Sequence, residues 1–124
     1  MAVITMMRFL ILFVVFALAG APAAFAHAML DHANPSPGSV LHAQPGKIVL
    51  DFTEAVEPAF SNVELHDSKG AAVAIGKPQT APDKRTRLVI QVPSLAPGTY
   101  TVIWHVTSVD THKTQGRFGF TVAP

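Results

Sequence analysis

The chain shows two hydrophobic patterns: one unbroken apolar run near its start, and then short alternating segments separated by polar turns. Between Lys47 and Thr53, the apolar residues Ile48, Leu50 and Phe52 fall on one face of an extended strand. Further runs with a period of two or with many β-branched residues are Met29–His32, Asn62–Leu65, Ala72–Ile75, Arg87–Val92, Thr99–Thr107 and Arg117–Val122. The pattern therefore predicts about seven short strands.

The segment Thr99–Thr107 carries the sharpest burial prediction of these runs. One of its faces is expected to lie in the core, and that face carries Tyr100, Val102, Trp104 and Val106. Tyr100 and Trp104 lie on the same strand face as two valines. We therefore interpret both rings as part of the core and not as a binding platform. The opposite face, which includes His105, is expected to meet solvent.

Turn-forming residues separate the expected strands, because proline presets φ and glycine permits conformations closed to other residues. These turns are Asn34–Gly38, Gln44–Gly46, Asp67–Gly70, Ala81–Asp83 and Ala96–Gly98. No stretch after residue 26 keeps an apolar stripe of helical period. We therefore predict an all-β domain, a Greek-key β-sandwich or barrel of immunoglobulin-like or cupredoxin-like type.

The first 26 residues have the layout of a secretory signal peptide. A short head with one cation, Arg8, precedes the apolar run Phe9–Leu18, and small residues lead up to Ala26. A retained membrane anchor is the alternative, but a glycine and a proline interrupt the uncharged stretch. We expect cleavage after Ala26, so that residues 27–124 form one exported, periplasmic domain.

Composition and charge exclude several classes of protein. The chain has no cysteine, so it lacks a disulfide scaffold, a thiolate metal site and a cysteine nucleophile. Arg8 is the only charged residue before Asp31, and the net charge of the whole chain is +1. Such a neutral domain offers no basic surface for nucleic acid.

The histidines carry the candidate chemistry, and all six follow the expected cleavage site. Cleavage after Ala26 would give His27 a free α-amine, which can chelate one metal together with the ring Nδ1, an arrangement called a histidine brace. Asp110 and His112 are two positions apart, so their side chains point the same way in an extended segment. Three nitrogens and one oxygen in a plane suit Cu(II). The alternative interpretation of this pair is a solvated carboxylate beside a surface histidine.

The sequence also resembles a known family, the CopC-type periplasmic copper-binding proteins. The resemblance covers essentially the whole chain after the expected cleavage site, and its most specific block is Pro97–Gly116. The segments that carry it are His27–Val40, Val49–Glu57, Leu95–Gly116 and Phe118–Val122. The resemblance implies a Greek-key β-barrel in which the N-terminal residue lies beside the loop that follows the tryptophan-bearing strand.

The resemblance further implies Cu(II) binding by His27, Asp110 and His112. It also places a glutamate near the metal, and Glu54 is the corresponding residue here, in an outer, orienting role. Some members of the family carry a methionine-rich loop for Cu(I), whereas Met29 is the only methionine of this chain after residue 26. We therefore expect a variant that binds Cu(II) only.

The function expected from these observations is non-enzymatic copper handling: a protein that sequesters, buffers or delivers Cu(II). Its partners would be the copper ion and, for delivery, an inner-membrane copper transporter, with neither nucleic acid nor a small-molecule substrate. Two alternatives remain open, a brace-type copper oxidoreductase and a metal-free structural β-sandwich module. The other histidines, His32 among them, are interpreted as structural or solvated. The cluster Lys84–Arg87 is interpreted as a solvated hairpin tip.

Overall fold

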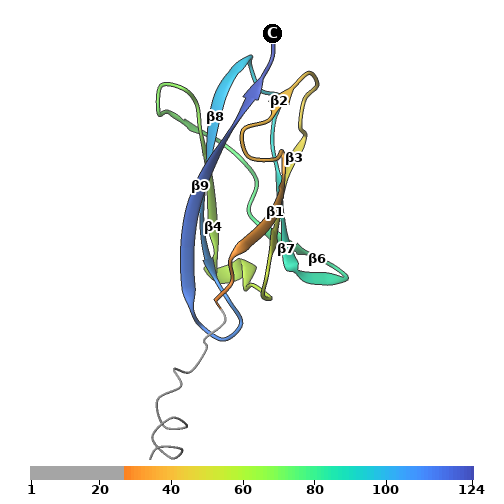
Figure 1. Cartoon of the computed structure of the whole chain (residues 1–124), viewed down its shortest axis with the longest axis vertical. Helices are drawn as coiled ribbons and strands as arrows, with labels where there is room; N and C mark the ends of the chain where they lie inside the picture. Colours follow the sequence, from red (N-terminus) through yellow and green to blue (C-terminus); the bar gives the residue numbers. More distant parts are fainter. Residues whose placement is uncertain (1–26) are drawn as a thin grey trace, which may run out of the picture.

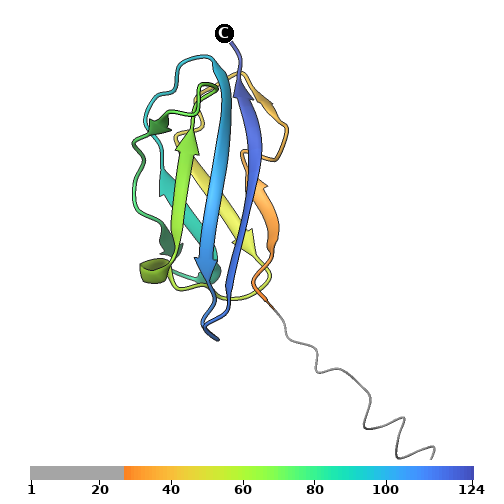
Figure 2. The ribbon, with the colours of Figure 1, turned by 90° about the vertical axis from the view of Figure 1, so that its left-hand side faces the viewer.

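The computed structural model describes residues 27–124, which form two β-sheets facing each other (Figures 1 and 2). The expectation of an all-β sandwich is confirmed. The predicted signal peptide, residues 1–26, lies outside the described residues. From residue 27 onward, no helix combines the length and the hydropathy needed to cross a membrane.

The two sheets contain four and five strands. The smaller sheet has the order β1 (Leu30–Asn34), β3 (Lys47–Phe52), β7 (Lys84–Gln91) and β6 (Gln79–Ala81). The larger sheet has the order β2 (Val40–Leu41), β9 (Lys113–Val122), β8 (Gly98–Thr107), β4 (Asn62–His66) and β5 (Ala72–Val73). Neighbouring strands are antiparallel, except that β2 runs parallel to β9. A single 3₁₀ turn, η1 (Pro58–Phe60), follows β3.

The core lies between the sheets, and the alternation along the strands fills it. In β3 the three apolar residues that were expected to share one face are buried: Ile48, Leu50 and Phe52. In β8 the predicted buried face is confirmed in full: Tyr100, Val102, Trp104 and Val106. The rings of Phe52 and Trp104 meet edge to face across the two layers, with centroids 5.2 Å apart.

Strand boundaries differ from the sequence prediction where pairing outweighs side-chain pattern. Strand β7 begins at Lys84 and strand β9 at Lys113, each well before the segment predicted from apolar residues. Full-length pairing with β8 holds the polar start of β9 extended, because the ladder bonds backbone groups whatever their side chains. The short edge strands β2 and β6 were not predicted, since two or three residues cannot show a period.

Both segments proposed for metal binding lie at one end of the sandwich. Figure 1 shows the described chain beginning beside the turn that joins β8 to β9, and Figure 2 shows the same neighbourhood from the side. The C-terminus leaves at the opposite end (Figure 1). The fold therefore brings together residues that are more than eighty positions apart in the chain.

Candidate metal centre

The segment that contains His27 is fixed to the sandwich by backbone and hydroxyl contacts. His27 itself is exposed, but the next residue, Ala28, is completely buried. The Met29 amide donates to Thr53 Oγ1 at 3.0 Å, and the Thr53 amide donates to the Met29 carbonyl at 2.9 Å. These bonds continue the pairing of β1 with β3 up to the first described residues.

The β8–β9 loop, Ser108–His112, is a tight turn closed by its own backbone. The Ser108 amide donates to the His112 carbonyl at 2.9 Å, and the Thr111 amide donates to the Ser108 carbonyl at 2.9 Å. Thr111 adopts a left-handed conformation with φ 73°, which turns the chain back on itself. The Val109 amide also donates to the Ala55 carbonyl at 3.0 Å, so the loop is tied to the neighbouring connection.

The structure brings the three proposed ligands together in pairs. The rings of His27 and His112 lie edge to face, with centroids 4.6 Å apart and planes inclined by 84°. The Asp110 Oδ2 atom lies 3.1 Å from His112 Nδ1. The spacing of the sequence could not establish that residue 27 meets residues 110–112, whereas the fold does place them side by side.

Ser108 organises the acidic side of this cluster, and sequence reasoning did not single it out. It is 1% exposed; its hydroxyl donates to Asp110 Oδ1, and the His112 carbonyl lies 3.2 Å from the same hydroxyl oxygen. The hydrogen bond from Ser108, followed by that from His112, holds the pKa of the Asp110 carboxyl below its ordinary value. Asp110 therefore stays ionised and available as an oxygen donor.

The separation of the donor atoms is compatible with copper. Two atoms bound at about 2.0–2.2 Å to adjacent corners of a square around one ion lie roughly 2.8–3.1 Å apart. His112 Nδ1 and Asp110 Oδ2, which are hydrogen-bonded here, have this spacing, so the imidazole would have to release that proton for both atoms to bind one ion. A ring nitrogen and a carboxylate oxygen are also donors that Cu(II) accepts in a tetragonal site.

Side chains alone do not complete a metal site in this part of the chain. Within residues 27–124, no group of three or more His, Asp and Glu side chains is gathered so as to hold a metal ion. The brace requires a further donor, the backbone nitrogen of His27, and in the full sequence that nitrogen is bonded to Ala26. The donor set is therefore completed only if the chain is cut between these two residues.

The remaining candidate residues lie around this cluster or away from it. Glu54, expected to orient the site, is half-buried and directly follows Thr53, which contacts the His27 carbonyl at 3.2 Å. His32 pairs with Asp51 across β1 and β3. His66 Nε2 lies 3.9 Å from Glu64 Oε2 on strand β4.

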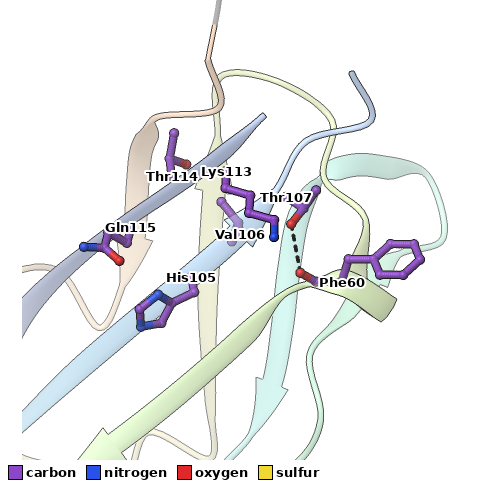
Figure 3. Close-up of a pocket in the computed structure, with 7 residues that line it drawn as sticks. All are labelled: Phe60, His105, Val106, Thr107, Lys113, Thr114 and Gln115. Atoms are coloured by element: carbon purple, nitrogen blue, oxygen red, sulfur yellow. Dashed lines mark hydrogen bonds between the residues drawn. The ribbon is translucent and has the colours of Figure 1, made fainter. Parts of the chain in front are cut away.

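His105 lines a shallow groove of about 370 Å³ on the outer face of the larger sheet (Figure 3). Phe60, 75% exposed, forms one wall of this groove, and the Thr107 hydroxyl donates to its carbonyl at 2.9 Å. Lys113 and Gln115 of β9 line the other side (Figure 3). None of the three proposed ligands is among the lining residues, although Lys113 and Thr114, which line the groove, directly follow His112 in the chain.

Comparison with known proteins finds a matching family model, similar sequences and similar solved structures. The CopC domain model matches residues 30–123. Protein YobA of Escherichia coli (strain K12) is 39% identical over 102 residues, which cover 82% of each chain. The crystal structure of CopC from Methylosinus trichosporium OB3b has a TM-score of 0.75 at 36% identity, covering 79% of this chain and 95% of that one. PcoC, a methionine-rich copper resistance protein from Escherichia coli, has a TM-score of 0.69 at 35% identity, with coverages of 78% and 99%.

Proposed function

Because the chain belongs to the CopC family, we propose that it is a periplasmic Cu(II)-binding protein that sequesters, buffers or delivers copper. The ligands would be the α-amine and Nδ1 of His27, a carboxylate oxygen of Asp110 and the imidazole of His112. The observation that carries the proposal is the meeting of the His27 and His112 rings at 4.6 Å beside the Asp110 carboxylate. Glu54 would act outside this set, through the segment that holds residue 27.

Removal of residues 1–26 is part of this proposal, since it creates the amine. A peptide nitrogen cannot act as the amine donor, so the uncut chain would lack one corner of the site. The same step would place the protein in the periplasm. Copper binding would therefore begin only after export.

Two features support a carrier of Cu(II) without a second, Cu(I) site. After residue 26 the chain has only Met29, so it lacks the soft thioethers that favour the reduced ion. Four donors from His27, Asp110 and His112 would fill the plane around the metal. An inner-membrane copper transporter is the recipient that a delivery role would require.

The test is to determine the mass of the exported protein and then to record its Cu(II) electron paramagnetic resonance spectrum. We expect a chain that begins at His27 and a tetragonal copper signal with hyperfine coupling to several nitrogens. A matched variant with one extra glycine before His27 should lose the amine ligand and bind copper much more weakly. Unchanged affinity in that variant would refute the brace.

The same preparation tests the enzymatic alternative. With copper and a reductant present, we expect no oxidation products from chitin or cellulose. Oxidised sugars in amounts above those released by free copper would overturn the carrier role and favour the brace-type oxidoreductase.

A further inference from the structure

Two threonine hydroxyls hold the backbone of the segment that would supply the brace. Thr53 Oγ1 donates to the carbonyl of His27 at 3.2 Å and accepts the amide of Met29 at 3.0 Å. Thr114 Oγ1 donates to the carbonyl of Ala28 at 2.6 Å. Three consecutive residues of the N-terminal segment are therefore each bonded to a threonine side chain.

The two threonines come from opposite layers of the sandwich. Thr53 follows β3 of the smaller sheet, whereas Thr114 is the second residue of β9 in the larger sheet. Ala28 lies between these layers and is completely buried. The segment is thus held from both sides immediately before β1 begins.

From these contacts we propose that Thr53 and Thr114 are positioning residues for copper, which fix His27 against His112 before the metal binds. This inference rests on the proposed brace. A free N-terminus ordinarily frays, because no contact restrains the backbone dihedral angles of its first residues. Here the carbonyls of residues 27 and 28 are both fixed, so the Cα of His27, and with it the origin of the amine and the ring, has a defined place.

Thr114 also links the two halves of the site directly. It lies two residues after His112, the last residue of the β8–β9 loop, so one short stretch of chain supplies a proposed ligand and holds the carbonyl next to the other one. His27 and His112 are therefore linked through a single side-chain hydrogen bond between their close neighbours in the chain, Ala28 and Thr114. A preorganised site of this kind loses less conformational freedom when it binds its ligand.

The test compares Thr53→Val and Thr114→Val with controls in which a hydroxyl is removed elsewhere. Thr99 and Thr121 share a hydrogen bond of 3.2 Å at the far end of the β8–β9 pair, so Thr99→Val and Thr121→Val are the matched controls. All proteins are prepared with His27 as the first residue. Cu(II) affinity is measured by competition with a chelating dye, and the copper environment by electron paramagnetic resonance.

We call the hydroxyl contacts of Thr53 and Thr114 with the N-terminal segment the threonine clamp. Thr53→Val and Thr114→Val, which each break part of this clamp, should bind Cu(II) about 10-fold more weakly, at the lower end of the range for losing an outer partner of a metal ligand. Their resonance spectra should show a mixture of copper environments in place of one. The two control variants should match the wild type in both measurements. Thr53→Ser and Thr114→Ser, which keep the hydroxyl, should restore wild-type affinity and a single spectrum.

The outcomes separate this inference from the proposed function. If the wild type itself gives no nitrogen-coupled copper signal, the brace is wrong, whatever the threonine variants do. If the wild type binds as proposed but the valine variants keep its affinity and spectrum, the clamp is wrong and the brace stands. Serine variants that weaken binding as much as the valine variants would also overturn the clamp, because the hydroxyl would then not be the group that matters.

Discussion

The alternation of apolar and polar residues in β3 suggests that Asp51 is exposed, but Asp51 is buried. It occupies an outward position of β3 and yet is only 7% exposed. Arg87 covers it, donating from Nε to Oδ1 at 2.7 Å and from Nη2 to Oδ2 at 3.0 Å. The interpretation of Lys84–Arg87 as a solvated hairpin tip is therefore wrong for Arg87, whose partner lies thirty-six positions away in the sequence.

This pair predicts how stability depends on pH. The hydrogen bond from Arg87 holds the pKa of Asp51 below its ordinary value, against the opposing effect of burial. The pair should therefore stabilise the fold fully above the unfolded-state pKa of about 3.9 and lose that effect as the pH falls through the lower folded-state value. In urea titrations, Arg87→Met should lower stability at pH 7 and converge on the wild type once the pH has fallen below the folded-state pKa of Asp51.

Arg85→Met is the matched control for this measurement. Arg85 pairs with Glu57 at 3.0 Å, but its side chain is 62% exposed, so solvent screens the interaction. The control should change stability little at either pH. A loss in Arg85→Met equal to that in Arg87→Met would contradict a special role for the Asp51 pair.

Copper binding at the residue scale should discriminate sharply among histidines. Asp110→Ala and His112→Ala each remove a proposed ligand, so we expect Cu(II) affinity to fall by roughly 100-fold or more, beyond the 10–100-fold effect of losing an outer partner. His42→Ala changes an exposed residue before β3 and should leave affinity unchanged. Dye competition at pH 7.5 measures all three, and equal losses would indicate diffuse binding to surface histidines.

At the scale of elements, the β8–β9 pair depends on a close approach between strands. Gly116 pairs with Trp104, and a Cβ built on Gly116 would lie 2.5 Å from Cζ2 of the indole. The ring lies across the glycine and also meets Phe52 of the facing sheet. Absence of a side chain at residue 116 is therefore what allows the only tryptophan of the chain to reach the core.

Gly116→Ala should displace this ring and destabilise the fold by about 1–3 kcal/mol, the usual cost of overpacking a core. The measurement is urea denaturation followed by tryptophan fluorescence. Gly119→Ala, also in β9, is the control, because its Cβ would approach no closer than 3.4 Å to the Tyr100 carbonyl. Equal stability of Gly116→Ala and the wild type would show that the ring has room to move aside.

The sequence predicted the long strands well because burial imposes a period of two on them. Strand β8 alternates cleanly and its expected buried face proved correct, and the apolar face of β3 is also buried, although Asp51 breaks the alternation there. The start of β9 was missed because its residues are polar or glycine and are held extended only by pairing with β8. Strand propensity is a property of one segment of sequence, whereas the hydrogen bonds between paired strands also depend on the neighbouring strand.

The residues proposed as ligands could be named from the sequence, but the residues that support them could not. His27, Asp110 and His112 differ chemically from their surroundings, and a resemblance to a known family placed them together. Ser108, Thr53 and Thr114 are ordinary hydroxyl residues, and their contacts span up to eighty-six positions. No local pattern marks such a contact, since any threonine in a strand would look the same.

For the whole molecule, copper should stabilise the fold through mass action. A ligand that binds only the native state adds about 2.7 kcal/mol at a free concentration 100-fold above its Kd. For a domain of this size, that corresponds to a rise in Tm of about 10–20 °C. Differential scanning calorimetry of the chain that begins at His27, with and without Cu(II) at pH 7.5, measures this rise.

The rise should shrink as the pH falls, because an amine and imidazoles must lose their protons before they bind a metal. The same scans at pH 5 should therefore show a smaller effect of copper. His112→Ala provides the control, with little response at either pH. A rise in Tm of the same size in that variant would contradict a single site.

The opposite placement of the two chain ends has a practical consequence. Pro124 lies at the end of the sandwich away from His27, and the preceding residue, Ala123, is tied to Leu41 by a backbone bond of 2.8 Å (Figure 1). An affinity tag, a fluorophore or a linker to a sensor chip can therefore be attached after Pro124, and the working end will still face outward. If the brace forms as proposed, the same attachment ahead of His27 would remove its amine ligand and so weaken the copper binding to be measured.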